Sequence, residues 1–171
     1  MTGNQKSKTA MQAVKSLSDV HASPVALRAR QWKYIYRAVD RDGDTVDFLL
    51  RVKRDHAAAR AFFERAIDLH GVPEQITIDK SGANTAAITS IQADSGLPIE
   101  MRQSKYLNNL VEQDHRAVKR ITQPMLGFKT FRCARILIAG IEVMHMIRKG
   151  QLGAIKDRGS SAANQFYSLA F

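Results

Sequence analysis

Two carboxylates, Asp79 and Glu112, have the type and setting that metal-dependent phosphate chemistry requires. Asp79 ends a short β-type run over residues 75–78, and Glu112 lies inside an amphipathic helical pattern. Mg²⁺ prefers hard carboxylate oxygens, and two such ions about 4 Å apart can stabilise the attacking and the leaving oxygen of a phosphoryl displacement. Aspartate also starts turns after strands, so Asp79 alone is weak evidence. The pair predicts a nuclease-type metal site, which would need a third acid from an early strand.

Basic side chains accompany Glu112 on the same predicted helix. Glu112, His115 and Lys119 follow an i, i+3, i+7 spacing, which places them on one helical face. Glu112 would coordinate a metal ion, His115 would contact the scissile strand or orient water, and Lys119 would hold a phosphate as a point charge. Arg116 and Arg120 lie beside this face and add positive potential. The alternative is a solvated helix face with the same charge pattern.

The overall composition points to a nucleic-acid partner. The chain has 171 residues, a formal net charge of +10 and a pI near 10.0. A chain this basic usually meets a polyanion, although a solvated basic surface is the alternative. Cys133 is the single cysteine, which excludes an intramolecular disulfide and fits a cytoplasmic location. The longest apolar run near it, residues 136–139, is too short to span a membrane.

Hydrophobic periodicity predicts a mixed sheet flanked by helices. Residues 1–30 lack a clear pattern and are expected to be poorly ordered or partly helical. Trp32, Tyr34 and Tyr36 are expected in the sheet core. The inner face of the last helix is expected to comprise Ile136, Leu137, Gly140, Ile141, Met144 and Ile147. The predicted strands cover residues 32–39, 45–50, 75–78 and 99–102, and the predicted helices cover residues 55–69, 85–93, 107–121 and 130–148.

The stretch from Gln31 to about Gln151 resembles the catalytic core of DDE-type insertion-sequence transposases. The resemblance implies a ribonuclease-H-like α/β fold, two Mg²⁺ or Mn²⁺ ions, and DNA strand cleavage and transfer on element ends and target DNA. The resemblance is compatible with a homo-oligomer, and it implies no membrane partner. The segments that carry it are Trp32–Asp40, Ile78–Asn84, Lys105–Arg116, Gly127–Phe131 and Ala139–Lys149.

The same resemblance assigns roles to individual residues. Asp79 corresponds to the second acid of the family triad, Glu112 to the third, and Lys119 to a basic residue on the same helix. Lys105, His115, Arg116 and Arg120 are the expected DNA contacts. The family's first acid lies shortly upstream of the Trp32 segment, where this chain has no acid between residues 20 and 39.

The missing acid has consequences for the predicted fold and activity. We expect a truncated or rearranged copy whose first strand is degraded or missing and whose strand-transfer activity is impaired. The predicted organisation is an atypical segment over residues 1–30, a catalytic-core-like domain over 31–151 and a tail over 152–171. A non-catalytic DNA-binding or subunit-interaction fragment is the alternative, and an ordinary ribonuclease-H-like nuclease ranks last because too few acids are placed.

Overall fold

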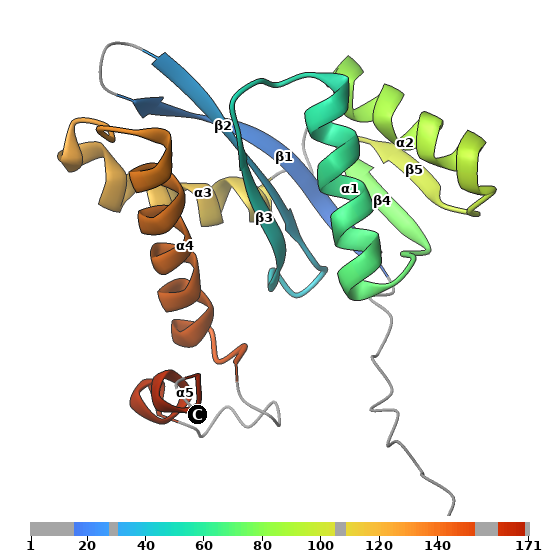
Figure 1. Ribbon diagram of the computed structural model, residues 1–171. Helices are drawn as coiled ribbons and strands as arrows, with labels where there is room; N and C mark the ends of the chain where they lie inside the picture. The colour runs from blue at the N-terminus through green and yellow to red at the C-terminus, as the bar shows by residue number, and fades with distance from the viewer. Residues whose placement is uncertain (1–15, 28–30, 105–108, 153–160, 170–171) are drawn as a thin grey trace, which may run out of the picture.

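The computed structural model describes residues 16–27, 31–104, 109–152 and 161–169, which form a five-stranded sheet with helices around it (Figure 1). The strands are β1 (Ser16–Leu27), β2 (Gln31–Val39), β3 (Thr45–Arg51), β4 (Gln75–Ile78) and β5 (Glu100–Gln103). The helices are α1 (His56–His70), α2 (Gly82–Ser95), α3 (Asn109–Thr122), the 3-10 turn η2 (Gln123–Met125), α4 (Phe131–Arg148) and α5 (Ala162–Ser168).

The sheet is mixed, as predicted. Its order is β3-β2-β1-β4-β5, with antiparallel ladders joining β1, β2 and β3 and parallel ladders joining β1 to β4 and β4 to β5. The hairpin between β2 and β3 turns at Gly43, whose φ of 80° suits glycine. The Asp40 carboxylate accepts hydrogen bonds from the backbone N–H groups of Asp42 and Asp44 and fixes this turn. The strands predicted over residues 32–39 and 45–50 are therefore confirmed, and they form a hairpin.

The prediction of a degraded or missing first strand is wrong, as is the expectation of a poorly ordered or helical segment for residues 16–27. These residues form β1, the central strand of the sheet. Val20 and Ala22 are buried at alternate positions, which supplies the apolar face of a strand. Proline has no backbone N–H and cannot donate to a strand ladder. Pro24 is tolerated because the ladder to β4 ends at Val20, so that β2 is the only described strand paired with β1 at this position. Residues 1–15 lie outside the described residues.

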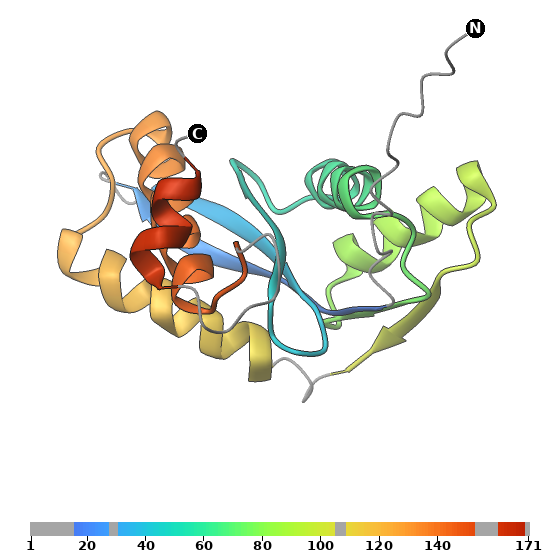
Figure 2. The same ribbon diagram turned by 90° about the horizontal axis from the view of Figure 1, so that it is seen from below.

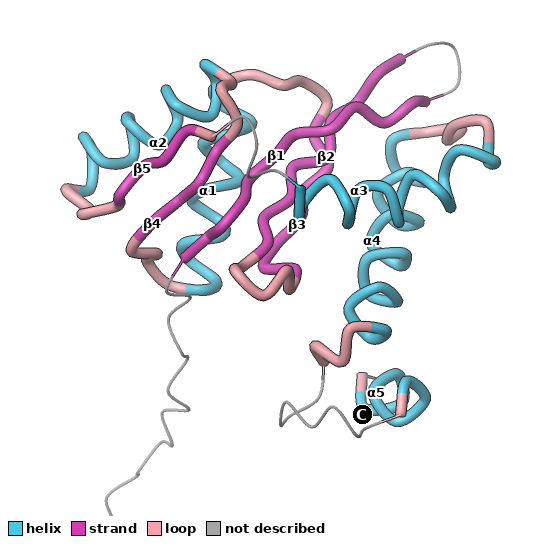
Figure 3. Tube along the Cα trace, turned by 180° about the vertical axis from the view of Figure 1, so that it is seen from behind, coloured by secondary structure: helices cyan, strands magenta, loops and turns pink. Residues whose placement is uncertain are grey.

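Two hydrophobic clusters hold the helices on opposite faces of the sheet. The first contains Tyr36 of β2, with Phe62 and Phe63 of α1 and Ile88 of α2. Figure 2 shows α1 and α2 side by side over one side of the sheet. The second cluster contains Ile35 of β2 and residues of α4. Because neighbouring residues of a strand point to opposite faces, α4 packs on the other face. The helix α3 runs alongside β1 and β2 on the side seen in Figure 3.

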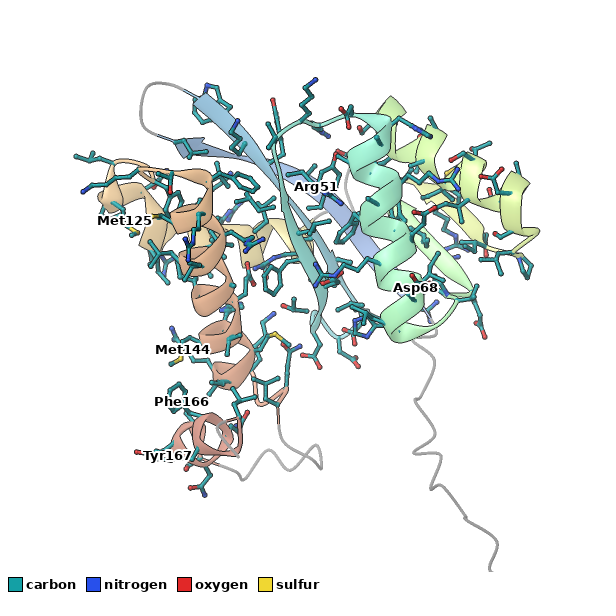
Figure 4. All side chains as sticks on the ribbon, in the orientation of Figure 1. Arg51, Asp68, Met125, Met144, Phe166 and Tyr167 are labelled. Atoms are coloured by element: carbon teal, nitrogen blue, oxygen red, sulfur yellow. The ribbon has the colours of Figure 1, made fainter. Side chains whose placement is uncertain are left out.

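Two expectations about the core need correction. Trp32 is 58% exposed, because β3 ends opposite Tyr34 and leaves this end of β2 uncovered on one side. On α4, Ile136, Leu137 and Met144 are exposed, and Met144 points away from the sheet (Figure 4). Ile147 is buried as predicted, and the rest of the buried face of α4 comprises Ala134, Ile138 and Glu142.

Candidate functional site

Asp79 lies directly after β4, at the carboxyl end of a central parallel strand. Its Oδ2 atom accepts a hydrogen bond from Arg54 Nη2 at 2.7 Å, and the same contact is an ion pair. Its Oδ1 atom accepts from Asn84 Nδ2 at 2.9 Å and from the Ser81 backbone N–H at 3.2 Å. The Asp79 side chain is 15% exposed. Its carboxylate is therefore held in place and already faces a positive charge.

Three separate elements position these partners. Arg54 lies between β3 and α1, one residue before Asp55, which caps α1 by accepting a hydrogen bond from the Ala58 backbone N–H at 2.9 Å. Asn84 is fully buried in the first turn of α2. Ser81 is the residue before α2. The segment from β4 into α2 thus wraps around Asp79, as expected for a carboxylate at a strand end.

Tyr36 of β2 contributes a neutral hydroxyl near this site. The side chain is fully buried, and its hydroxyl has no hydrogen-bond partner among the described residues. Burial raises the pKa of Tyr36 above 10.0, while the charge of Arg54 acts in the opposite direction and that of Asp79 in the same direction. The hydroxyl therefore stays protonated at neutral pH and adds no negative charge.

Two buried apolar residues of β1, Val20 and Ala22, lie near the end of the ladder that joins β1 to β4. Val20 pairs with Ile78, the residue before Asp79, and Ala22 pairs with Tyr36 in the neighbouring ladder. Both Val20 and Ala22 are buried. Neither Val20 nor Ala22 supplies a carboxylate to Asp79, and the side chains of Asp19 and His21 are not among those described.

The helix α3 starts from the edge of the sheet at which Asp79 lies. The Ser104 backbone N–H donates to the Ile78 carbonyl at 3.1 Å, so β5 ends beside the end of β4, and α3 begins at Asn109. Glu112 and His115 belong to α3, but their side chains are not among those described, and Lys105 lies outside the described residues. A shared site of Asp79 and Glu112 stays a prediction.

The remaining predicted DNA contacts are exposed on α3. Arg116, Lys119 and Arg120 are all accessible to solvent. Lys119 also lines a groove with Trp32 and Leu126. The exposure of these cations agrees with the predicted contact surface and equally with a solvated helix face.

The described donor set does not fit a metal centre. Within the described ranges no three His, Cys, Asp or Glu side chains come together in a way that could hold an ion. Asp79 is the one described carboxylate among the predicted ligands, and it already forms an ion pair with Arg54. Sequence reasoning missed Arg54, Tyr36 and Asn84, because their roles arise from contacts between distant segments. Arg54 lies between a predicted strand and the start of a predicted helix, and no sequence motif marks it as a site residue.

The family follows from comparison with known sequences. A family model described as a DDE domain, of the IS240 transposase type, matches residues 5–151. The chain belongs to this DDE transposase family. The transposase for insertion sequence-like element IS431mec of Staphylococcus aureus is 34% identical over 137 residues, covering 79% of this chain and 59% of that protein. The transposase for insertion sequence element IS257 in transposon Tn4003, also from Staphylococcus aureus, matches to the same extent. The chain thus spans about 59% of the length of these transposases.

Solved structures support the family fold. The catalytic core domain of HTLV-2 integrase, determined in complex with magnesium, aligns in its dimeric form with a TM-score of 0.60 and 14% identity. That alignment covers 90% of this chain and 97% of the integrase core. The trimeric form gives a TM-score of 0.59 over 89% of this chain and 96% of that core. The DDE domain of this chain therefore has a mixed α/β fold like the retroviral integrase core. No helix in the described part of the chain is long and apolar enough to cross a membrane.

Proposed function

We propose that this chain is the DNA-handling core of an insertion-sequence transposase in which strand cleavage and transfer is impaired. Membership of the DDE family supports DNA transposition as the activity of its relatives. The observation that carries the impairment is the setting of Asp79. Its carboxylate pairs with Arg54, and Val20, the residue of β1 opposite Ile78, is apolar.

A divalent metal enters the proposal through the family resemblance alone. The family resemblance implies Mg²⁺ or Mn²⁺, which would supply Lewis-acid stabilisation to a phosphoryl transfer. In the proposal, Glu112 would be the second carboxylate beside Asp79. Because the described residues do not fit a two-ion site, we assign no reaction step to a metal in this chain.

The proposed DNA contacts come from α3 and the segment before it. Arg116, Lys119 and Arg120 would hold phosphates, with His115 and Lys105 nearby in the sequence. Other exposed cations extend the basic surface onto the following segment and α4. They are Lys129, Arg132, Arg135 and Arg148. Such a surface binds phosphate backbones without reading base sequence, so it equally supports the alternative of a non-catalytic DNA-binding fragment.

A strand-transfer assay tests the proposal. The substrate is a plasmid carrying insertion-sequence end DNA, incubated with Mg²⁺ or Mn²⁺, and the IS431mec transposase on its own ends is the positive control. We expect no strand-transfer product from this chain. Robust product that disappears in Asp79→Asn would show that an acid outside the described donor set completes the site.

A further inference from the structure

A groove lies between the strand pair β1–β2 and the end of α3. It is lined by Trp32 of β2, by Lys119 of α3 and by Leu126, which follows η2. Its volume is about 370 Å³, at the lower end of the range of about 300–1,000 Å³ that is typical of small-molecule sites. The groove therefore has room for one nucleotide-sized group and is too small for a duplex.

The groove exposes large apolar side chains that the fold does not bury. Trp32 is 58% exposed and Leu126 is 88% exposed. Leu126 also has a φ of 53°, a left-handed conformation that is costly for leucine. Met125, the residue before it, is exposed in the loop that joins α3 to α4 (Figure 4). An aromatic and an aliphatic side chain that stay in solvent beside a groove mark a binding surface.

The charge around the groove favours an anionic partner. Lys119 is exposed on its wall, and no acidic residue is among the described residues that line it. Arg116 and Arg120 are exposed on the same helix, and Thr122 and Gln123 add hydrogen-bonding groups to the lining. Proteins bind single-stranded nucleic acid with aromatic rings beside cations, because the bases stack on the rings while the cations hold the phosphate backbone.

We propose that this groove binds one unpaired nucleobase of a DNA strand, stacked on Trp32, with Lys119 holding an adjacent phosphate. The inference rests on the proposed function, which makes DNA the partner, and it adds that the bound DNA includes an unpaired base.

The position of the groove along β1 suits a strand that also passes the candidate site. Val20 lies opposite Ile78, at the end of β4, and Pro24, which lines the groove, is four residues further along β1. At about 3.3 Å per residue this is a distance of about 13 Å along the strand. A few nucleotides, at about 3.4 Å each, span it.

Trp32 is the single tryptophan of the chain, so its fluorescence reports on the groove directly. The probe is an oligothymidylate of about 12 nucleotides, added to the full chain in EDTA. We expect saturable quenching of the Trp32 emission, because a base stacked on the indole ring quenches it. A strand of the same length without bases carries the same phosphates. It should bind about tenfold more weakly and leave the Trp32 emission unchanged.

Substitutions test the two side chains, with fluorescence anisotropy of a labelled strand as the readout. Trp32→Ala should weaken binding of the oligothymidylate about tenfold and remove its advantage over the abasic strand, whereas Trp32→Phe keeps an aromatic face and should retain most of the affinity. Lys119→Gln should weaken both strands alike, because it removes a phosphate contact. The matched control is Tyr167→Ala, which removes an exposed aromatic side chain from α5 and should change neither affinity.

The outcomes separate this inference from the proposed function. Equal affinity of the wild type for the two strands, or unchanged Trp32 emission on binding, would overturn the inference and leave the proposed function standing. This comparison uses the wild-type protein, so it decides the point even if Trp32→Ala fails to fold. No binding of either strand would overturn the inference as well, and if a random duplex also fails to bind, the proposed function falls with it. A blue shift of the Trp32 emission with rising protein concentration, in the absence of DNA, would show that a second copy covers the groove and would refute the base site.

Discussion

Asp55 and Asp79 both lie beside the start of a helix, but their carboxylates form different interactions. The Asp55 carboxylate accepts a hydrogen bond from the Ala58 backbone N–H at the start of α1, so Asp55 stabilises the protein as a helix cap. Asp79 binds the guanidinium of Arg54, the residue before Asp55, and reaches across to α2 through Asn84. One short segment before α1 thus supplies both the helix cap and the counter-charge of the candidate site.

Removing the cap should weaken the protein without touching Asp79. Asp55→Ala should lower the free energy of unfolding by about 1 kcal/mol, because an orphan N–H of α1 loses its acceptor. Urea unfolding followed by circular dichroism measures this. Asp55→Asn is the matched control, since asparagine caps helices about as well as aspartate. Equal stability of Asp55→Ala and the wild type would contradict the assignment of the cap.

Asp47 should make stability depend on pH. This residue of β3 is 6% exposed, and burial raises its pKa above the ordinary 3.8, although the Arg65 guanidinium at 3.2 Å opposes the shift. A raised folded-state pKa contributes stability that is fully present below 3.8 and is lost as the pH rises through the folded-state value.

The variant Asp47→Asn cannot ionise and should escape this loss. Its free energy of unfolding relative to the wild type should therefore increase as the pH rises from below 3.8 towards neutrality. Urea unfolding of both proteins across this range gives the difference. A difference that stays constant with pH would show that the burial of Asp47 does not perturb its ionisation.

At the scale of elements, a buried ion pair fastens α4 to the sheet. Arg37 of β2 and Glu142 of α4 are both fully buried and contact each other. Such a pair costs desolvation of two charges, so it is weak evidence for stability. Losing one partner is a different matter, because the other charge is then left in the interior.

Breaking this ion pair should lower the free energy of unfolding, and removing both charges should restore most of it. Glu142→Gln should lower the free energy of unfolding by about 3–5 kcal/mol, because Arg37 stays buried without its counter-charge. The double variant Arg37→Met with Glu142→Leu should recover most of that loss. Urea unfolding of the full double-mutant cycle gives the coupling energy. If the double variant is no more stable than Glu142→Gln, the loss comes from packing and the ion-pair explanation fails.

Local patterns predicted most elements of this fold, and contacts between distant segments explain the misses. The hairpin at Gly43 and the start of α1 at Asp55 carry strong local signals, and both are confirmed. The strand β1 contains Pro24 and few β-branched residues, and it is held by neighbours on both sides, which no local pattern reveals. On α4 two helical stripes compete, and the sheet buries the one containing Ile138 and Glu142.

The candidate site was predictable only in part for the same reason. The position of Asp79 after a strand follows from local pattern, and the structure places it there. Its pairing with Arg54 joins residues 25 positions apart and depends on β3 and β4 lying in one sheet. The family resemblance pointed to a missing acid, but only the register of β1 shows that Val20 lies opposite Ile78, the residue before Asp79.

For the molecule as a whole, the net charge of +10 should dominate DNA binding. Affinity for a random duplex should fall steeply with salt, because each neutralised phosphate releases counterions. The double variant Arg116→Gln with Arg120→Gln should reduce the slope of log affinity against log salt by about 2. Fluorescence anisotropy over a salt series measures the slopes.

The control for this measurement is an equal charge loss on another helix. Arg60→Gln with Arg65→Gln removes two cations of α1, which are paired with acids, and should leave the slope close to that of the wild type. Identical slopes for the two double variants would mean that α3 has no special part in DNA binding and that the charge acts diffusely.

The central position of β1 also bears on how the chain is made. The first described strand, β1, needs β4 as its parallel neighbour, and β4 is translated only after β2, β3 and α1. Until then the nascent three-stranded sheet has an open side along β1, the arrangement most prone to pairing with another chain. Pairing between segments so far apart in sequence is slow. We therefore expect synthesis of this protein to pass through a stage in which an open sheet edge is exposed to aggregation.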